Sequence, residues 1–257
     1  MTALNFYRAL AGVGPVTENV IASAGDALHA TYMVNEDVIA HSEDAGSPFF
    51  TPEGNAAAET SNLTATSDPD ATPNWAVDSL MRAPFHGVGF IDPRLVESGF
   101  GIAHDTSGSI ETAAAIDVLS IRTNDPPAGL AFPLIFPGNG TTVPLDTYNG
   151  NETPDPLTSC LGYEAPTGLP LIVQLDTAPS VTASSLARDG RALEHCVFDA
   201  TTYTNPDPSL QSLGRNVLAA RNAIFLIPRA KLTPGTYEVS ITTGGTPVAW
   251  SFTVDCQ

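Results

Sequence analysis

The feature that most constrains this chain is a change of sequence character at about Asn124. Before it, segments with helical spacing of apolar residues alternate with short runs rich in β-branched and aromatic residues. After it, a stretch dense in Pro, Gly, Asn and Asp leads into short alternating segments separated by turn residues. The chain has 257 residues, enough for two modest domains. We therefore predict an α+β domain over residues 1–124, a Pro- and Gly-rich connecting segment over 125–164, and an all-β domain over 165–257.

Spacing and capping residues place the elements of the first region. Three helices are predicted, over residues 4–11, 17–34 and 73–83. Thr17 is predicted as the N-cap of the second helix, and Pro84 is predicted to end the third. Strands are predicted over residues 88–95, 98–106 and 113–121, because these runs are rich in β-branched and aromatic residues. Helices grouped around a small antiparallel sheet indicate a layered α+β fold.

The second region contains strand patterns only. The five candidate strands cover residues 168–176, 185–198, 222–229, 235–243 and 247–255. Short strands with turn residues between them are typical of a β-sandwich. The last two segments, "GTYEVSITT" and "PVAWSFTVD", resemble the closing hairpin of bacterial Ig-like domains. That resemblance implies an Ig-like sandwich without chemistry of its own.

The charge balance restricts the partners of the protein. The chain has 28 Asp and Glu residues against 10 Lys and Arg, a net charge of −18. A broad surface for nucleic acid or anionic lipid is therefore not expected, because phosphates need cationic partners. A cationic ligand or a divalent metal meets no such barrier. No apolar run approaches the roughly 20 residues that span a bilayer, so no transmembrane segment is expected. No charged-then-apolar secretion signal is recognised at the start of the sequence, although "MTALNFYRAL" could be a mature sequence behind an added Met.

Three cysteines, all after residue 159, indicate one disulfide and one spare thiol. We predict the bridge between Cys160 and Cys196, which would fasten the segment before the sandwich to one of its strands. Cys256 is the competing partner. A disulfide implies an oxidising compartment, so the protein is expected to be secreted or extracytoplasmic. Buried, reduced cysteines are the alternative.

A candidate polar site is built from two histidines and nearby acids. His41 is followed by Glu43 and, after a Pro-containing turn, by Glu53, while His86 follows the third predicted helix. If that helix packs on the loop, His41, Glu53 and His86 converge on one cleft. Ser42 and Glu43 are further candidates for the lining of this cleft. Imidazoles and a carboxylate are what zinc requires, and the same groups serve as general acid and base. Ser42 beside His41 is not expected to be a nucleophile, because an adjacent pair rarely aligns a hydroxyl with its acceptor nitrogen.

The order of these pieces resembles the CAP superfamily (cysteine-rich secretory, antigen 5, pathogenesis-related), also called SCP-like. Bacterial members open with N-x-x-R and continue with an "HS" pair, a "GEN"-like segment, a helix with "WM" and a "SPGHR"-like turn. Those places are taken here by Asn5 to Arg8, by His41 and Ser42, and by "AETSNL", "AVDSLM" and "APFHGVG". The resemblance covers about residues 3–121. It implies an α-β-α sandwich and an extracytoplasmic location.

In that family two histidines and two glutamates line a central cavity that can take a divalent metal. By position, His41 and His86 match the two histidines. Glu59 is offset by a residue or two from the first acid, and Asp78 stands nearest to the second. Glu53 is the preferred substitute, which makes His41, Glu53 and His86 the predicted ligands of a zinc ion.

Taken together, the sequence predicts an extracytoplasmic CAP-like protein that binds a metal ion or a small or lipid-like ligand in a cleft lined by His and Glu. The Ig-like domain would then be a spacer or an adhesion module at the cell envelope. A binding protein is expected rather than an enzyme. The alternatives are a hydrolase that uses a histidine base or a metal-bound water, and a scaffold in which the histidines only brace the fold.

Overall fold

The computed structural model describes residues 1–256, which form two compact units. The first unit comprises Met1–Arg8, Gly14–Met81 and Gly89–Ala128. The second comprises Ala9–Val13, Arg82–Val88 and residues 129–256. Both units contain helices as well as strands, which confirms the prediction of an α+β protein. Among the described residues, no helix has the length and apolar character needed to cross a membrane.

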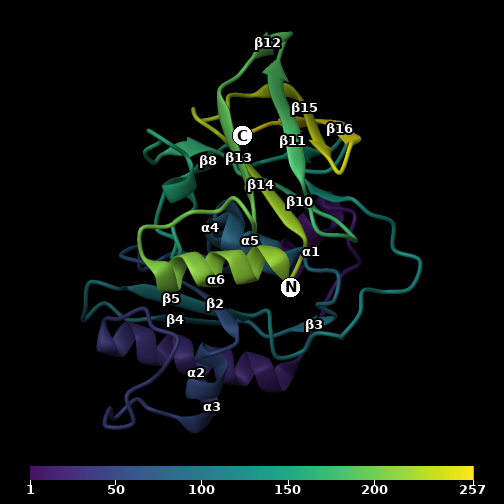
Figure 1. The fold of residues 1–257 in the computed structure, drawn as a ribbon. Coiled ribbons are helices and arrows are strands. Elements are labelled where there is room, and N and C mark those ends of the chain that lie inside the picture. Colours follow the sequence, from purple (N-terminus) through teal and green to yellow (C-terminus); the bar gives the residue numbers. More distant parts are fainter. Residues whose placement is uncertain (257) are drawn as a thin grey trace. The chain divides into compact units, whose positions relative to one another are not determined.

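A three-stranded antiparallel sheet lies at the centre of the first unit (Figure 1). Its order is β2 (Ser61–Thr66), β5 (Thr112–Asp117), β4 (Gly101–His104). The helix α2 (Val20–Glu36) packs on one face, where alanines of β5 and Leu63 form a core with Met33. Gly101 allows this approach, because a Cβ there would lie 2.1 Å from the backbone nitrogen of Ala27.

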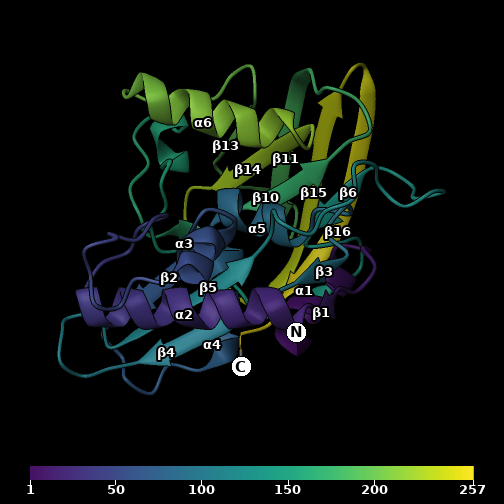
Figure 2. The ribbon, with the colours of Figure 1, turned by 90° about the horizontal axis from the view of Figure 1, so that it is seen from below.

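Helices flank both faces of this sheet. The helix α3 (Pro52–Ala58) lies against α2, as Figures 1 and 2 show. On the face opposite Leu63, Thr64 of β2 contacts Ser79 of α4 (Pro73–Arg82), with 3.3 Å between the hydroxyl oxygens. Successive strand residues point to opposite faces, so α2 and α4 lie on different sides. The helix α1 (Thr2–Leu10) reaches α4 through a 2.6 Å bond from the Tyr7 hydroxyl to Asp78.

Two side chains of α1 hold the loops around it. The Asn5 side chain donates to the Val16 carbonyl at 2.9 Å and accepts from the Val16 N–H at 2.8 Å. Arg8 is 1% exposed and donates to the carbonyls of Gly14, Phe90, Asp92 and Leu95. Burial lowers the pKa of Arg8 to about 10, against the opposing effect of the Asp92 charge. The adjoining segments form the parallel pair β1 (Thr17–Glu18) and β3 (Glu97–Ser98).

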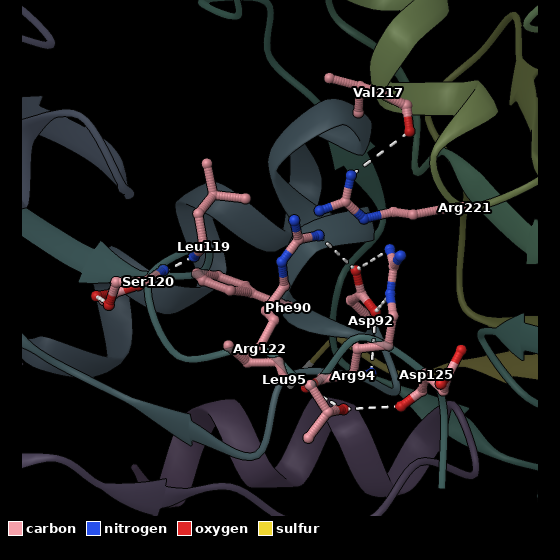
Figure 3. A network of polar contacts seen from close by, with 12 residues as sticks. Phe90, Asp92, Arg94, Leu95, Leu119, Ser120, Arg122, Asp125, Val217 and Arg221 are labelled. Carbon is pink, nitrogen blue, oxygen red and sulfur yellow. Dashed lines mark hydrogen bonds and ion pairs between the residues drawn. The ribbon is translucent and has the colours of Figure 1, made fainter.

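A second cluster fixes the loop that Arg8 holds. The Asp92 carboxyl is fully buried and receives two bonds from Arg94, at 2.8 and 2.9 Å, and one from Arg122 at 3.1 Å (Figure 3). The bonds to Asp92 raise the pKa of Arg94. A bidentate arginine–carboxylate pair is strong and geometrically specific. These arginines are therefore committed to the fold of the first unit.

Two sheets form most of the second unit. The first, entirely antiparallel, has the order β13 (His195–Asp199), β14 (Ala223–Pro228), β10 (Leu171–Gln174), β6 (Leu134–Phe136). The second has the order β12 (Arg191–Ala192), β11 (Val181–Arg188), β15 (Gly235–Thr243), β16 (Thr246–Val254), β7 (Thr142–Val143). Ser184 of β11 and His195 of β13 join the two sheets by a 3.0 Å bond.

Smaller elements complete this unit. They are the pair β8 (Thr147–Tyr148) and β9 (Thr167–Gly168), the short 3-10 helix η1 (Pro156–Ser159), and the helix α6 (Pro208–Ala219), which packs on β13 and β14. The first residues of α5 (Pro84–Phe90) also belong here, and Phe85 makes edge-on contacts with Tyr203 and Phe225. Cys160 and Cys196 form a disulfide, which confirms the predicted bridge, and Cys256 is free and exposed.

Several local expectations were wrong. The predicted strand over residues 88–95 is instead the end of α5 and a loop, because Pro84 occupies the start of a helix, where its missing N–H costs nothing. The second helix begins at Val20, since Asn19 rather than Thr17 accepts from the first helical N–H groups. The elements α3, β2 and α6 were not predicted, and residues 125–164 supply three strands, β6, β7 and β8.

Candidate functional site

The pair of His86 and Glu152 is the candidate functional site in the second unit. Both the Nδ1 atom and the backbone N–H of His86 bond to one carboxylate oxygen of Glu152, at 2.7 and 2.9 Å. The imidazole is 17% exposed, whereas the Glu152 side chain is fully buried. Burial raises the pKa of Glu152, and the bonds from His86 oppose that rise. A carboxylate that holds Nδ1–H fixes the tautomer and orientation of the ring.

Two buried oxygens near this pair lack protein partners. The second carboxylate oxygen of Glu152, Oε2, has no hydrogen bond within the described residues, and neither does the Tyr148 hydroxyl. The charge of Glu152 contributes to the raised pKa of Tyr148, after the effect of burial. A buried polar group without a hydrogen-bond partner lowers the stability of the fold, so each of these oxygens is expected to be satisfied by a water, an ion or a ligand.

A pocket of about 390 Å³ adjoins this pair. Its lining comes from residues 150–165 and includes three acids, Glu152, Asp155 and Glu164, together with the Tyr163 ring and Asn151. No Lys, Arg or His belongs to this lining. Asp155 is held in place as the cap of η1, where it accepts from the Leu157 N–H at 2.8 Å. The pocket therefore offers oxygen acceptors and negative charge.

His41 lies in the first unit, in the loop before α3, and its ring contacts Ala58, the last residue of that helix. Its Nδ1 atom is 2.8 Å from the Ala58 carbonyl, which can only accept, so Nδ1 carries the proton. In the neutral ring, Nε2 is then the basic nitrogen, and the side chain is exposed. Such a tautomer suits a proton acceptor or a metal ligand.

The predicted acids of the first unit are distributed around α3 and α4. Glu59 caps the end of α3 that His41 contacts, whereas Glu53 lies in the first turn of this helix. Their Cα positions are separated by about 9 Å along the axis, at 1.5 Å per residue. Ser42 is exposed. Asp78 is engaged by the Tyr7 hydroxyl, as described above.

Glu43 is committed to an internal pair with His29. The Nδ1 atom of His29 is 3.0 Å from Glu43 Oε1, Nε2 is 3.0 Å from the Ala40 carbonyl, and both side chains are fully buried. Because that carbonyl only accepts, Nε2 of His29 carries a proton. Glu43 Oε2 also accepts from the Thr51 N–H at 2.9 Å. The pair thus braces the loop 40–51 against α2.

Within each unit, the described residues include no group of three or more His, Cys, Asp or Glu side chains arranged to hold a metal ion. The predicted zinc ligands His41 and Glu53 belong to the first unit and His86 to the second, so the three-ligand set stays a prediction. Sequence reasoning missed Glu152 and Tyr148. The only signal was their place in a Pro- and Gly-rich segment, which says nothing about a histidine 66 residues earlier.

Comparisons with known proteins assign the chain to no family. No protein-family model matches the chain, and no curated protein matches it. Among solved structures, it is similar to PcoC, a methionine-rich copper resistance protein from Escherichia coli, with 15% identity and a TM-score of 0.27 over 49% of this chain and 100% of that chain. Selenomethionine PcoC from the same organism gives 16% identity and a TM-score of 0.23, over 47% and 95% of the two chains. TM-scores this low support no argument about fold or copper.

Proposed function

We propose that this protein is an extracytoplasmic binding protein, with a CAP-like N-terminal region and an Ig-like C-terminal region, that holds a small cationic or hydrogen-bond-donating ligand in the pocket at Glu152, whose carboxylate is positioned by His86. A metal ion is the alternative ligand at the same pair. The predicted residues His41 and Glu53 remain candidates for a separate contribution from the first unit.

The observation that carries the proposal is the unpartnered Oε2 atom of Glu152. One oxygen of this carboxylate is held by two N–H groups of His86, while the other has no donor although the side chain is fully buried. A ligand N–H or O–H group would satisfy it. The Tyr148 hydroxyl, also without a partner among the described residues, would add a donor or an acceptor.

The lining of the pocket favours a positive or donating ligand. Three acidic residues and no basic residue line about 390 Å³, and the Glu152 side chain among them is fully buried. A concave site with one sign of charge focuses the potential and raises the local concentration of ions of the opposite sign. This volume suits a small molecule. An acyl chain would leave the acidic residues of this lining without partners, so the polar ligand is preferred to a lipid-like one.

Two further features support the location and the family. The disulfide between Cys160 and Cys196 is typical of proteins from oxidising compartments. Asn5 and Arg8, the two fixed positions of the N-x-x-R motif, hold backbone groups around α1. These are structural roles, as expected where a motif defines a fold rather than a reaction.

The test uses ethanolamine as an amine probe and ethylene glycol as its uncharged counterpart, with titration calorimetry at pH 7. Ethanolamine is expected to bind, ethylene glycol to bind at least tenfold more weakly, and Glu152→Gln to lose ethanolamine binding. Glu238→Gln, on the exposed face of β15, is the matched control. Equal binding of ethanolamine to wild type and Glu152→Gln would contradict the proposal.

Metal content, measured on protein purified without chelators, separates the two ligand classes. Stoichiometric metal that is lost in His86→Ala and retained in the Glu238→Gln control would assign the site to a metal ion. Ester or peptide hydrolysis that disappears in His86→Ala, with unchanged thermal stability, would instead favour the hydrolase. Loss of stability alone in that variant would favour the scaffold.

A further inference from the structure

A second pocket in the second unit has the opposite charge. It measures about 200 Å³ and is lined by the end of β11, the loop between β12 and β13, the end of β14 with the segment that follows it, and Tyr237 of β15. Arg188, Arg229 and Lys231 line it, and Glu194 is its single acid. Three of the ten basic residues of a chain with a net charge of −18 thus meet at one small cavity.

The basic side chains of this pocket are held in place. Arg188 donates to the Pro234 carbonyl at 2.7 Å and to the Thr233 hydroxyl, and lies over the Tyr237 ring, 5.8 Å from its centre. Arg229 donates to the Gly162 carbonyl at 3.0 Å and also lies over a tyrosine ring. A guanidinium has five N–H donors, so each arginine keeps donors for a ligand. Preorganised donors reduce the entropy lost on binding.

The acids near these bases are exposed or lie outside the lining. Arg229 pairs with Glu194 at 2.7 Å, and both side chains are about half exposed, at 47% and 63%. Arg188 lies 3.4 Å from Asp189, which is 78% exposed, and Lys231 lies 2.9 Å from Asp146, outside the lining. Exposed ion pairs are weak, so Glu194 can rotate away when an anion enters. The lining alone carries three positive charges against one negative charge.

The floor of the pocket is apolar. Leu193, Pro228, Leu232 and the ring of Tyr237 contribute to the lining. The volume lies below the roughly 300–1,000 Å³ of drug-sized sites, so the ligand must be small. At physiological ionic strength the Debye length is about 8 Å, so the potential in the pocket depends on its three bases and on the acids paired with them, Asp189, Glu194 and Asp146, and little on the distant acids of the chain.

We propose that this pocket binds a small carboxylate or phosphate anion attached to a compact apolar group. The anionic head lies between Arg188, Arg229 and Lys231, and the apolar part contacts Leu232 and Tyr237. The pocket is chemically distinct from the acid-lined one at Glu152, so this inference stands independently of the function proposed above.

The experiment measures binding of benzoate, phenyl phosphate, benzyl alcohol and benzylamine to the full chain carrying Glu152→Gln, in which the amine site proposed above is removed, by NMR or calorimetry at pH 7 and 0.15 M salt. Both anions are expected to bind, and the alcohol and the amine to bind at least tenfold more weakly. Whichever of benzoate and phenyl phosphate binds more tightly identifies the head group that the pocket prefers, carboxylate or phosphate. Equal binding of benzylamine and the anions would overturn the proposal.

Three variants locate the binding. Arg229→Gln is expected to weaken the tighter anion at least tenfold, while Arg191→Gln, on β12 outside the lining, changes it less than twofold. Glu194→Gln is expected to strengthen binding several-fold, because it releases Arg229 from its competing carboxylate. A gain of affinity cannot result from a folding defect. Unchanged affinity in both Arg229→Gln and Glu194→Gln would refute the site.

Discussion

The buried carboxyl of Asp26 predicts an unusual dependence of stability on pH. Asp26, on α2, is fully buried; Oδ1 accepts from the Ser61 hydroxyl at 2.6 Å, and Oδ2 has no partner within the described residues. Burial, with a further contribution from the Asp117 charge, raises the pKa of Asp26 from 3.8 to about 7. The folded state therefore holds the proton more tightly than the unfolded state does.

The sign and size follow from that difference. The stabilisation is complete below the unfolded pKa of 3.8 and is lost as the pH rises through the folded pKa of about 7. Roughly three pKa units, at 1.36 kcal/mol each, correspond to about 4 kcal/mol. Asp26→Asn keeps an acceptor for Ser61 and removes the charge. Relative to this variant, wild type should thus lose about 4 kcal/mol of unfolding free energy between pH 4 and pH 8.

The assay is urea unfolding between pH 4 and pH 8, followed by tryptophan fluorescence. Trp75 lies in the first unit and Trp250 in the second, so a Trp250→Phe background reports on the unit that contains Asp26. Asp70→Asn, at an exposed carboxyl, is the matched control and should show no such trend. A difference between wild type and Asp26→Asn that stays constant across this range would refute the reasoning.

Three other substitutions test the contacts described above. Arg8→Met leaves four backbone carbonyls without their donor and should cost about 3 kcal/mol or more of unfolding free energy, measured in urea. A loss below about 1 kcal/mol would contradict the role of this side chain. Removing the disulfide with Cys160→Ser and Cys196→Ser frees a loop with a sequence separation of 36 and should cost about 3–4 kcal/mol of unfolding free energy in calorimetry. Unchanged stability of this double variant would contradict the stabilising role of the bridge. His29→Phe leaves the buried Glu43 carboxyl without its partner and should cost about 3–5 kcal/mol of unfolding free energy. Adding Glu43→Leu should recover part of this loss, and no recovery would argue against the pair.

Local patterns predicted the elements whose signals are local. The helical spacing of α1, the Pro73 entry of α4 and the alternation in β15 and β16 all lie within a few residues and appear as expected. The helix α5 was missed because "VGFIDPRL" has the composition of a strand and Pro84 was predicted to end the preceding helix, although Pro84 also favours a helix start. The disulfide was predictable because only three cysteines exist to be paired.

The candidate site was only half predictable. His86 was singled out from its motif, but its partner Glu152 lies in a segment without periodicity and meets His86 only in the folded chain. Glu43 was predicted to line a cleft, yet it pairs with His29, because a buried carboxyl needs donors and α2 supplies one. Distances between residues far apart in sequence depend on how elements pack, and no spacing rule encodes that.

The division of the chain into interleaved units has a consequence for synthesis on the ribosome. Residues 82–88 belong to the second unit, and Phe85 packs on Phe225, which is translated 140 residues later. At about 5–20 residues per second, Phe85 waits roughly 7–28 s for that partner. During this interval the nascent chain carries an uncovered aromatic side chain next to His86, and it cannot complete the His86–Glu152 pair until Glu152 has emerged.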